Sequence, residues 1–208
     1  MPKGFYRDQD ICFDIKKLQN AIKEVDSRVA RQSPLGKNDL TAICLTQIPE
    51  DPNSITGGNV RGLYWTKPDS TYKEVEREAP INESQYSEFV KLFEDTYFKE
   101  VYDKLTTKYE LGRVRLLWKM PRTTLSWHRD PEPRIHIPII TNFGARMCIG
   151  EVVHHMPADG SVWVTNNTKY HNAFNGGEED RIHLVATVLN CDMKIFDSYP
   201  NSSLNQIW

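Results

Sequence analysis

Apolar residues recur at three- and four-residue steps in two stretches of the first half of the chain. This spacing places them on one face of a helix, which predicts helices over Asp14–Val29 and Asn82–Leu105, the second being the longest of the chain. Asp14 can cap the first helix, and Asn82 with Gln85 resembles a capping box at the start of the second. The apolar positions are Ile15, Leu18, Ile22, Val25 and Val29, then Tyr86, Phe89, Val90, Phe93, Tyr97, Val101 and Leu105.

The segment between these two helices lacks a helical period. Leu40–Ile48 reads "LTAICLTQI" and predicts a strand. Residues 50–77 are rich in Pro, Gly, Asn and Ser, around a short strand expected at Gly62–Trp65. Long loops in compact domains are often functional, so this loop, with its "SITGG", is either a lid over a site or a structural wrap.

From Gly112 onward the pattern changes to short runs rich in β-branched and aromatic residues, several of them separated by turn formers. Strand after strand in this way is typical of a barrel or a double-sheet jelly roll. Because no Pro/Ser/Gly-rich linker lies near residue 110, we expect one domain over residues 1–208. Its parts are a helical and loop region (1–111), a β core (112–192) and a C-terminal tail (193–208). The runs are "RVRLLWKM", "RIHIPIIT", "ARMCIG", "SVWVT" and "RIHLVATVLN".

Composition narrows the class of protein. The 208 residues are 39% apolar, enough for a sizeable core, and the formal net charge is −2. This balance does not predict binding to nucleic acid or to an anionic membrane. Neither a signal peptide nor a membrane-spanning run is recognisable, and the four cysteines match no zinc or redox spacing. We therefore expect four free thiols and a cytoplasmic protein.

One short stretch carries candidate metal ligands. His128 and Asp130 are two residues apart, so on an extended backbone their side chains leave the same face. His171, which follows the run "SVWVT" and a short turn, is the best third ligand. Two histidines and one carboxylate make the facial triad of non-haem Fe(II) oxygenases, which leaves positions open for a co-substrate and O₂. The alternative is that His128 and His171 are ordinary hydrogen-bonded histidines.

Two of the predicted strands carry Arg-x-His on one face and aliphatic residues on the other. In "RIHIPI" these polar residues are Arg134 and His136, and in "RIHL" they are Arg181 and His183. If both polar faces point inward they form a cationic pocket, in which Arg181 suits a carboxylate because its planar fork matches that group. If they point outward, they are the solvated face of a half-exposed sheet.

Other polar residues compete for the same roles. His154 and His155 are adjacent, so on a strand they face opposite ways, and we interpret them as loop histidines. His183 is kept as a residue that supports a ligand by hydrogen bonding. Arg122 is either a further holder of a substrate carboxylate or a solvated turn residue.

Taken together, His128-x-Asp130, His171 and Arg181 resemble the motif of 2-oxoglutarate and Fe(II)-dependent oxygenases. The fuller pattern over residues 112–190 is similar to the aspartyl/asparaginyl β-hydroxylase family. It is carried by "VRLLWKMPRTTLSWH", "RIHIPI" and "GSVWVTNNTKYHNAFNGGEEDRIHLVATV". The resemblance implies an α+β, mainly β fold: a double-stranded β-helix (jelly-roll, cupin-like) core with the N-terminal helices packed on one sheet.

The resemblance also implies roles for single residues. His128, Asp130 and His171 would bind Fe(II), with 2-oxoglutarate as co-substrate and O₂ as oxidant. Arg181 would clamp the distal carboxylate of 2-oxoglutarate. Arg134 and His136 would lie near its other end or near the substrate carboxylate.

Two positions depart from the family pattern. The best-known animal members carry glycine where this chain has Asp130, whereas free-proline hydroxylases of related sequence keep the carboxylate. The family also places a serine beside the co-substrate, at the position of Leu117 here. This departure leaves open which residue completes the clamp.

The expected function is hydroxylation of an amino acid, free or as a peptide or protein side chain, with release of succinate and CO₂. Arg134 and Arg122 are the candidates for the substrate carboxylate. The alternatives are a metal-binding jelly-roll module without turnover and an oxygenase acting on another small molecule. A nucleic-acid demethylase is disfavoured by the charge balance and by Thr187, where those enzymes usually carry a second arginine. We expect a small-molecule or peptide substrate, without a nucleic-acid or membrane partner.

Overall fold

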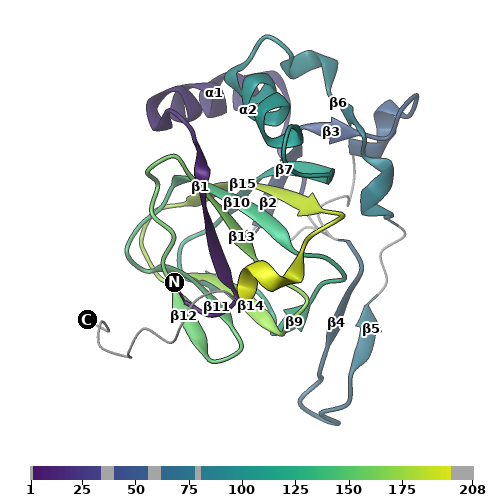
Figure 1. The fold of residues 1–208 in the computed structure, drawn as a ribbon, viewed down its shortest axis with the longest axis vertical. Helices are drawn as coiled ribbons and strands as arrows, with labels where there is room; N and C mark the ends of the chain where they lie inside the picture. Colours follow the sequence, from purple (N-terminus) through teal and green to yellow (C-terminus); the bar gives the residue numbers. More distant parts are fainter. Residues whose placement is uncertain (1, 34–39, 56–61, 78–80, 198–208) are drawn as a thin grey trace.

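The computed structural model describes residues 2–33, 40–55, 62–77 and 81–197. Two antiparallel sheets form its centre (Figure 1). The first has six strands in the order β1 (Phe5–Cys12), β13 (Ser161–Thr165), β10 (Arg134–Ile140), β15 (Arg181–Val188), β7 (Leu111–Lys119) and β2 (Leu40–Cys44). The second has seven: β12 (Val152–His154), β11 (Ala145–Ile149), β14 (His171–Asn175), β9 (His128–Arg129), β4 (Tyr64–Thr66), β5 (Val75–Arg77) and, paired with β14, β8 (Thr123–Thr124).

The order of the strands is that of a jelly roll. From β7 to β15 the chain alternates between the two sheets. There are two exceptions: the short strands β8 and β9 follow each other within the second sheet, and so do the strands of the β11–β12 hairpin. Strands β13, β10, β15 and β7 thus face β12, β11, β14 and β9. The predicted mainly β, double-stranded β-helix fold is confirmed.

Helices cover the outer side of the six-stranded sheet. They are α1 (Ile15–Arg28) and α2 (Tyr97–Thr106), drawn above that sheet in Figure 1. Asp14 accepts hydrogen bonds from the backbone N–H groups of Lys16 and Lys17, so the predicted cap of α1 is confirmed. The buried face of α1 packs into one core cluster with the isoleucines of β10 and the aliphatic residues of β15.

The long helix predicted over Asn82–Leu105 is wrong. The segment contains η2 (Glu83–Gln85), β6 (Glu88–Phe89), η3 (Lys91–Phe93) and only then α2. Asn82 does cap, but it caps a single 3₁₀ turn. Short turns satisfy the same three- and four-residue apolar spacing, while tertiary hydrogen bonds such as Val90 N–H to Leu45 C=O prevent a continuous helix.

The N-terminal half contributes more strands than its sequence predicts. β1 was not expected, although it pairs with β13 at one edge of the sheet. The strand predicted over Leu40–Ile48 is divided into β2 and β3 (Thr46–Gln47), and β3 pairs with β6. The remaining 3₁₀ turns are η1 (Pro52–Ile55) and η4 (Met193–Phe196).

The loop predicted over residues 50–77 contains a hairpin where it is described. β4 pairs with β5 and also with β9, so this hairpin extends the second sheet. Residues 56–58, which end the "SITGG" of this loop, lie outside the described residues, as does most of the C-terminal tail. All four cysteines are free thiols, as expected. Within the part of the chain that is described, no helix has the length and apolar character required to span a bilayer.

Candidate active site

Two neighbouring strands of the second sheet bring the candidate metal ligands together. His128 on β9 is the direct cross-strand partner of His171 on β14, and their ring centroids are 4.3 Å apart. The carboxylate of Asp130 lies 3.9 Å from Nε2 of His128 and 3.8 Å from Nε2 of His171. One ligand atom from each residue falls within 4.8 Å of the other two. The pairing of β9 with β14 therefore brings His171 next to His128 and Asp130, although it lies far from them in the sequence.

The backbone orients both imidazole rings. Nδ1 of His128 lies 2.6 Å from the carbonyl oxygen of Ser126, and Nδ1 of His171 lies 2.9 Å from that of Lys169. A carbonyl can only accept, so each Nδ1 carries the proton and each Nε2 presents a lone pair. Burial holds the pKa of His171 down at about 4, which keeps its ring neutral near pH 7. Two such nitrogens with a carboxylate fit Fe(II).

Asn167 connects two of the three candidate ligands. Its amide nitrogen lies 2.9 Å from Nε2 of His171 and 3.2 Å from Oδ2 of Asp130. Its amide oxygen accepts a hydrogen bond of 2.6 Å from the hydroxyl of Thr165, which fixes the orientation of the amide. Sequence reasoning missed Asn167, because a buried asparagine after a strand carries no distinctive spacing.

The two Arg-x-His faces point inward, which decides between the alternatives that the sequence left open. Arg134, His136, Arg181 and His183 are all at most 5% exposed. They lie on the face of the six-stranded sheet opposite the aliphatic residues that pack against the helices. This cationic face therefore looks into the space between the two sheets.

Arg181 lies in a buried part of this space. Its Nη2 lies 2.8 Å from Nδ1 of His183, which therefore accepts the hydrogen bond. Among the described residues no carboxylate lies within ion-pair distance of Arg181, and burial lowers the pKa of its guanidinium to about 10. In the same set, Nε2 of His136 and of His183 are buried without a hydrogen-bond partner. Because Nδ1 of His183 accepts, its Nε2 is an unsatisfied donor, and such a donor beside an uncompensated cation fits the carboxylate of an oxo acid.

Arg134 has a different environment, because carboxylates surround it. Glu132 accepts a hydrogen bond of 3.1 Å from its Nη1, Asp130 lies 3.5 Å from its Nε, and Glu83 lies 3.7 Å from its Nη2. Arg134 thus connects the candidate metal ligands to a buried ionic cluster.

Glu83 is the centre of that cluster. It is 5% exposed, forms two hydrogen bonds of 2.7 and 3.0 Å with Arg113, and accepts another of 3.0 Å from Thr187. Burial alone would raise its pKa, but the charges of Arg134, Arg113 and Arg115 outweigh burial and hold the pKa at about 2. Glu83 was also missed, because it was interpreted as part of the long helix.

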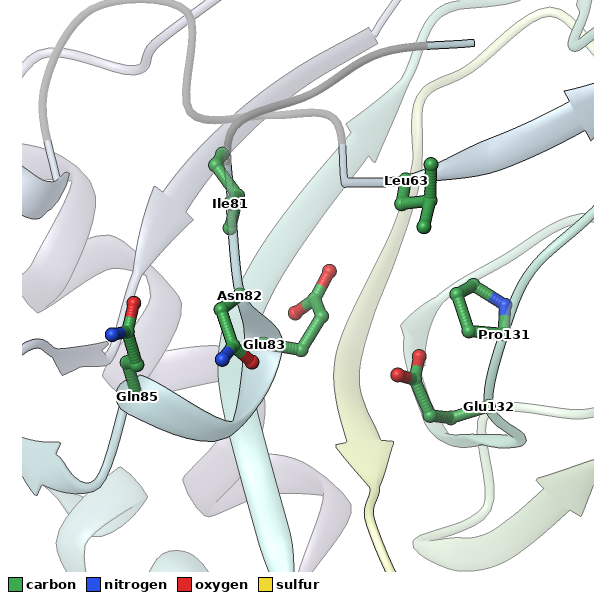
Figure 2. A pocket seen from close by; sticks show the side chains of 7 residues that line it. All are labelled: Leu63, Ile81, Asn82, Glu83, Gln85, Pro131 and Glu132. Carbon is green, nitrogen blue, oxygen red and sulfur yellow. The ribbon is translucent and has the colours of Figure 1, made fainter. Parts of the chain in front are cut away.

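A cavity of about 410 Å³ opens beside this cluster (Figure 2). Its wall on one side comes from η2 and its flanks, and on the other from the two residues that follow Asp130. Figure 2 shows the carboxylates of Glu83 and Glu132 pointing into the same space from opposite sides. The lining residues are Leu63, Ile81, Asn82, Glu83, Gln85, Pro131 and Glu132.

Comparison with protein families gives one match. Residues 52–190, well over half of the chain, match the model of the aspartyl/asparaginyl β-hydroxylase family. The chain belongs to this family. It is therefore an oxidoreductase of the hydroxylase class, and iron with 2-oxoglutarate is the cofactor pair that the family implies. No curated protein matches the chain.

Several solved structures are similar at low identity. An oxidoreductase of the 2OG-Fe(II) oxygenase family from Burkholderia pseudomallei is 15% identical, over 88% of this chain and 83% of its own, with a TM-score of 0.48. IDO from Bacillus thuringiensis is 9% identical, over 89% of each chain, with a TM-score of 0.47. The viral collagen prolyl hydroxylase of Paramecium Bursaria Chlorella virus-1 is 9% identical, over 89% and 96%, also with a TM-score of 0.47.

The departure from the β-hydroxylase family at Leu117 has a structural explanation. Leu117 is the cross-strand partner of His183 and packs with Leu40 and Ala42, so an apolar contact with β2 occupies the family's serine position. Two residues further along β7, Lys119 is the partner of Arg181 and is fully buried. A second buried basic side chain thus lies beside Arg181, which the sequence pattern did not indicate.

Three other candidates lie apart from the triad. Arg122 is in a turn with φ of 56°, its side chain is 76% exposed, and it pairs with Glu178 at 3.1 Å. These contacts favour the solvated turn residue over a holder of substrate. His154 contacts the rings of Phe5 and Trp163, and His155 lies 2.9 Å from the carbonyl of Ala145. Both contacts are structural.

The β4–β5 hairpin braces the outer side of the triad. Thr66 is the cross-strand partner of His128, and Tyr64 meets the His128 ring edge-on at 5.7 Å. Arg129 forms two hydrogen bonds of 2.7 and 2.8 Å with Glu74, which also accepts one of 2.9 Å from Tyr170. Arg129 and Tyr170, which are each adjacent to a candidate histidine, thus both form hydrogen bonds with the carboxylate of Glu74.

Proposed function

We propose that the protein hydroxylates an amino acid, free or as a peptide or protein side chain, in a reaction coupled to 2-oxoglutarate and O₂. One oxygen atom enters the substrate and the other enters succinate, while the carboxyl carbon of the oxo acid leaves as CO₂. The observation that carries the proposal is the cluster of His128, Asp130 and His171, whose ligand atoms converge within 4.8 Å.

The three residues would hold Fe(II) through two neutral imidazoles and one carboxylate. Bound Fe(II) would supply open coordination positions at which the oxo acid and O₂ react. The chain's own part is to present both Nε2 lone pairs, fixed by the carbonyls of Ser126 and Lys169, and to keep the carboxylate beside them. The backbone thus fixes both rings, and on binding the ion would replace the Asn167 amide N–H that lies 2.9 Å from Nε2 of His171.

Arg181 would bind the distal carboxylate of 2-oxoglutarate. Because His183 accepts from Arg181 through Nδ1, its Nε2 carries the proton and can donate to the same ligand. Burial and the nearby Arg181 charge hold the pKa values of His136 and His183 well below the usual range, so both rings stay neutral donors or acceptors. The burial of Arg181, His136 and His183 would exclude water from this end of the bound oxo acid.

Anaerobic titration tests this proposal. Fe(II) added with 2-oxoglutarate should give a weak visible charge-transfer band, and aerobic incubation should form succinate. His171→Ala should lose both signals. A matched control is His155→Asn, which changes a histidine whose only described hydrogen bond is to a backbone carbonyl. Absence of the band in the wild type, with unchanged metal binding in His171→Ala, would leave a jelly-roll module without turnover.

A further inference from the structure

We infer that the cavity beside Asp130 takes a free α-amino acid, whose carboxylate binds Arg134 and whose ammonium group binds Glu132. This inference rests on the proposed function and names its substrate class. It assigns to Glu132 the part of a specificity residue, which distinguishes a free amino acid from a residue inside a peptide.

The first step concerns Arg134, whose three nitrogens each face a carboxylate. Arg134 does not itself line the cavity, but Glu132, which does, accepts a hydrogen bond from Nη1 of the arginine, so displacement of Glu132 would open the guanidinium to a substrate carboxylate. Glu83 is held by Arg113 and Thr187, and Asp130 is held by Asn167. Glu132 is therefore the partner that can yield.

Glu132 has the exposure and the position for such an exchange. Its side chain is 27% exposed, against 5% for Glu83 and 14% for Asp130. Its only hydrogen bond within the described residues is the one to Arg134. It lies in the turn after Asp130, outside any strand, and lines the cavity. A carboxylate that leaves Arg134 there stays at the cavity wall.

The second step concerns charge. An α-amino acid carries its carboxylate and its ammonium group on the same carbon, so it can insert between Arg134 and Glu132 and replace one ion pair with two. The insertion adds no net charge to a buried cluster, which avoids the cost of an uncompensated ion. An N-acylated amino acid brings only the carboxylate and would leave Glu132 without a partner. A residue within a peptide chain brings neither charge.

The third step concerns size and place. About 410 Å³ is toward the small end of ligand pockets, which span roughly 300–1,000 Å³, and suits a single amino acid. Leu63, Ile81 and Pro131 offer an apolar wall for the rest of the substrate. Arg134 joins the cavity to the candidate metal ligands, because it contacts Glu132 at 3.1 Å and Asp130 at 3.5 Å.

Calorimetry and succinate formation with a defined panel test the inference. The panel is the common free L-amino acids, their N-acetyl derivatives, and short peptides blocked at both ends. We expect at least one free amino acid to bind and to stimulate succinate formation, with its N-acetyl derivative at least tenfold weaker. Equal binding of the free and acetylated forms would overturn the inference, as would a panel in which only blocked peptides bind. If N-acetylated lysine or arginine bound as tightly as its free form, the side-chain cation alone would explain the binding. This result would overturn the inference too.

A charge-neutral variant supplies the second readout. Glu132→Gln keeps the shape of the side chain and should raise the KM for the free amino acid at least tenfold, while the KM for 2-oxoglutarate stays within twofold. The control is Asp159→Asn, which removes the carboxylate partner of Arg7 on the molecular surface and should change neither constant. An unchanged KM for the amino acid in Glu132→Gln would overturn the inference.

Failure of the proposed function is distinguishable from failure of this inference. A protein that binds no Fe(II) and forms no succinate would contradict the proposed function. Calorimetric binding of a free amino acid, weakened at least tenfold in Glu132→Gln, would still support the inference about the substrate. Succinate formation without discrimination between free and acetylated substrates would support the proposed function and overturn the inference about the substrate.

Discussion

On β10, Ile135, Ile137 and Ile139 point toward the helices, whereas Arg134 and His136 point into the space between the sheets. Both faces of the strand are buried, so burial does not distinguish them. On the outer face, a buried isoleucine contributes about 1.5–3 kcal/mol by leaving water. On the inner face, each buried cation costs free energy unless it is paired. The outer face therefore stabilises the fold. Part of that stabilisation offsets the cost of burying the charged groups of the inner face, which can bind a ligand.

The same contrast holds within the inner face. Arg113 is compensated by Glu83 through two hydrogen bonds, whereas Arg181 is without a carboxylate partner among the described residues. Compensated cations are part of the structure, and an uncompensated cation indicates a place for an anionic ligand. The following predictions test this division.

Glu83→Gln should have the largest effect on stability. It removes one partner of a buried ion pair, which costs about 3–5 kcal/mol in the free energy of unfolding at pH 7. The folded pKa of about 2 lies below the ordinary 4.5, so the stabilisation is complete above pH 4.5 and is lost as the pH falls toward 2. Urea unfolding at pH 7 and pH 3 should therefore show a smaller difference at pH 3. The exposed Glu178→Gln is the control, and a difference independent of pH would contradict the ion-pair explanation.

Ile137→Ala tests the outer face. The side chain is fully buried, so its truncation should lower the free energy of unfolding by about 2–5 kcal/mol through lost burial and a cavity. Affinity for Fe(II) should not change, because Ile137 points away from the site. Urea unfolding and anaerobic titration measure the two quantities. A tenfold loss of Fe(II) affinity in the folded variant would show that the two faces are not independent.

Arg181→Met tests the inner face and should have the opposite pattern to Ile137→Ala, because it should weaken ligand binding without lowering stability. Replacing an uncompensated buried charge by an apolar side chain should leave the free energy of unfolding unchanged or raise it by about 1–4 kcal/mol. The KM for 2-oxoglutarate should rise at least tenfold, because its carboxylate loses the guanidinium. Unfolding curves and succinate formation at varied 2-oxoglutarate measure these effects. A clear loss of stability would instead make Arg181 a structural residue.

Asn167→Ala should have the smallest effect. Loss of the hydrogen bond that orients the Asp130 carboxylate should lower metal affinity by about 10- to 100-fold without abolishing binding. Asn166→Ala is the matched control, since Asn166 is equally buried and bonds through its side chain to Thr168, away from the triad. Anaerobic Fe(II) titration compares the two variants, and equal affinities would remove Asn167 from the site.

Much of the β core could be predicted because its strands alternate in sequence. "RIHIPI" and "RIHL" separate polar from aliphatic positions so regularly that both faces of β10 and β15 were assigned, although not which face was inner. The pairing of His128 with Asp130 followed from two-residue spacing. Nothing in the local pattern shows which buried face meets a second sheet, so the inward direction required the structure.

The missed elements depend on distant partners. β1 has charged residues at its centre, and Asp8 is buried there only because Tyr109 and Lys108 reach it across the fold. Glu83 resembled a surface helix residue until the structure brought Arg113 against it. Such residues become buried through contacts between segments far apart in the chain, which short-range periodicity does not record.

The ring of each candidate histidine is oriented by the carbonyl oxygen of the residue two places before it, just ahead of the strand that the histidine begins. Main-chain carbonyls are present whatever side chain is attached. Ser126 and Lys169 can therefore be exchanged in evolution or by a protein engineer with little effect on ring orientation. A catalytic geometry held in this way tolerates divergence nearby, and it could be transplanted to another antiparallel strand pair that keeps the same register.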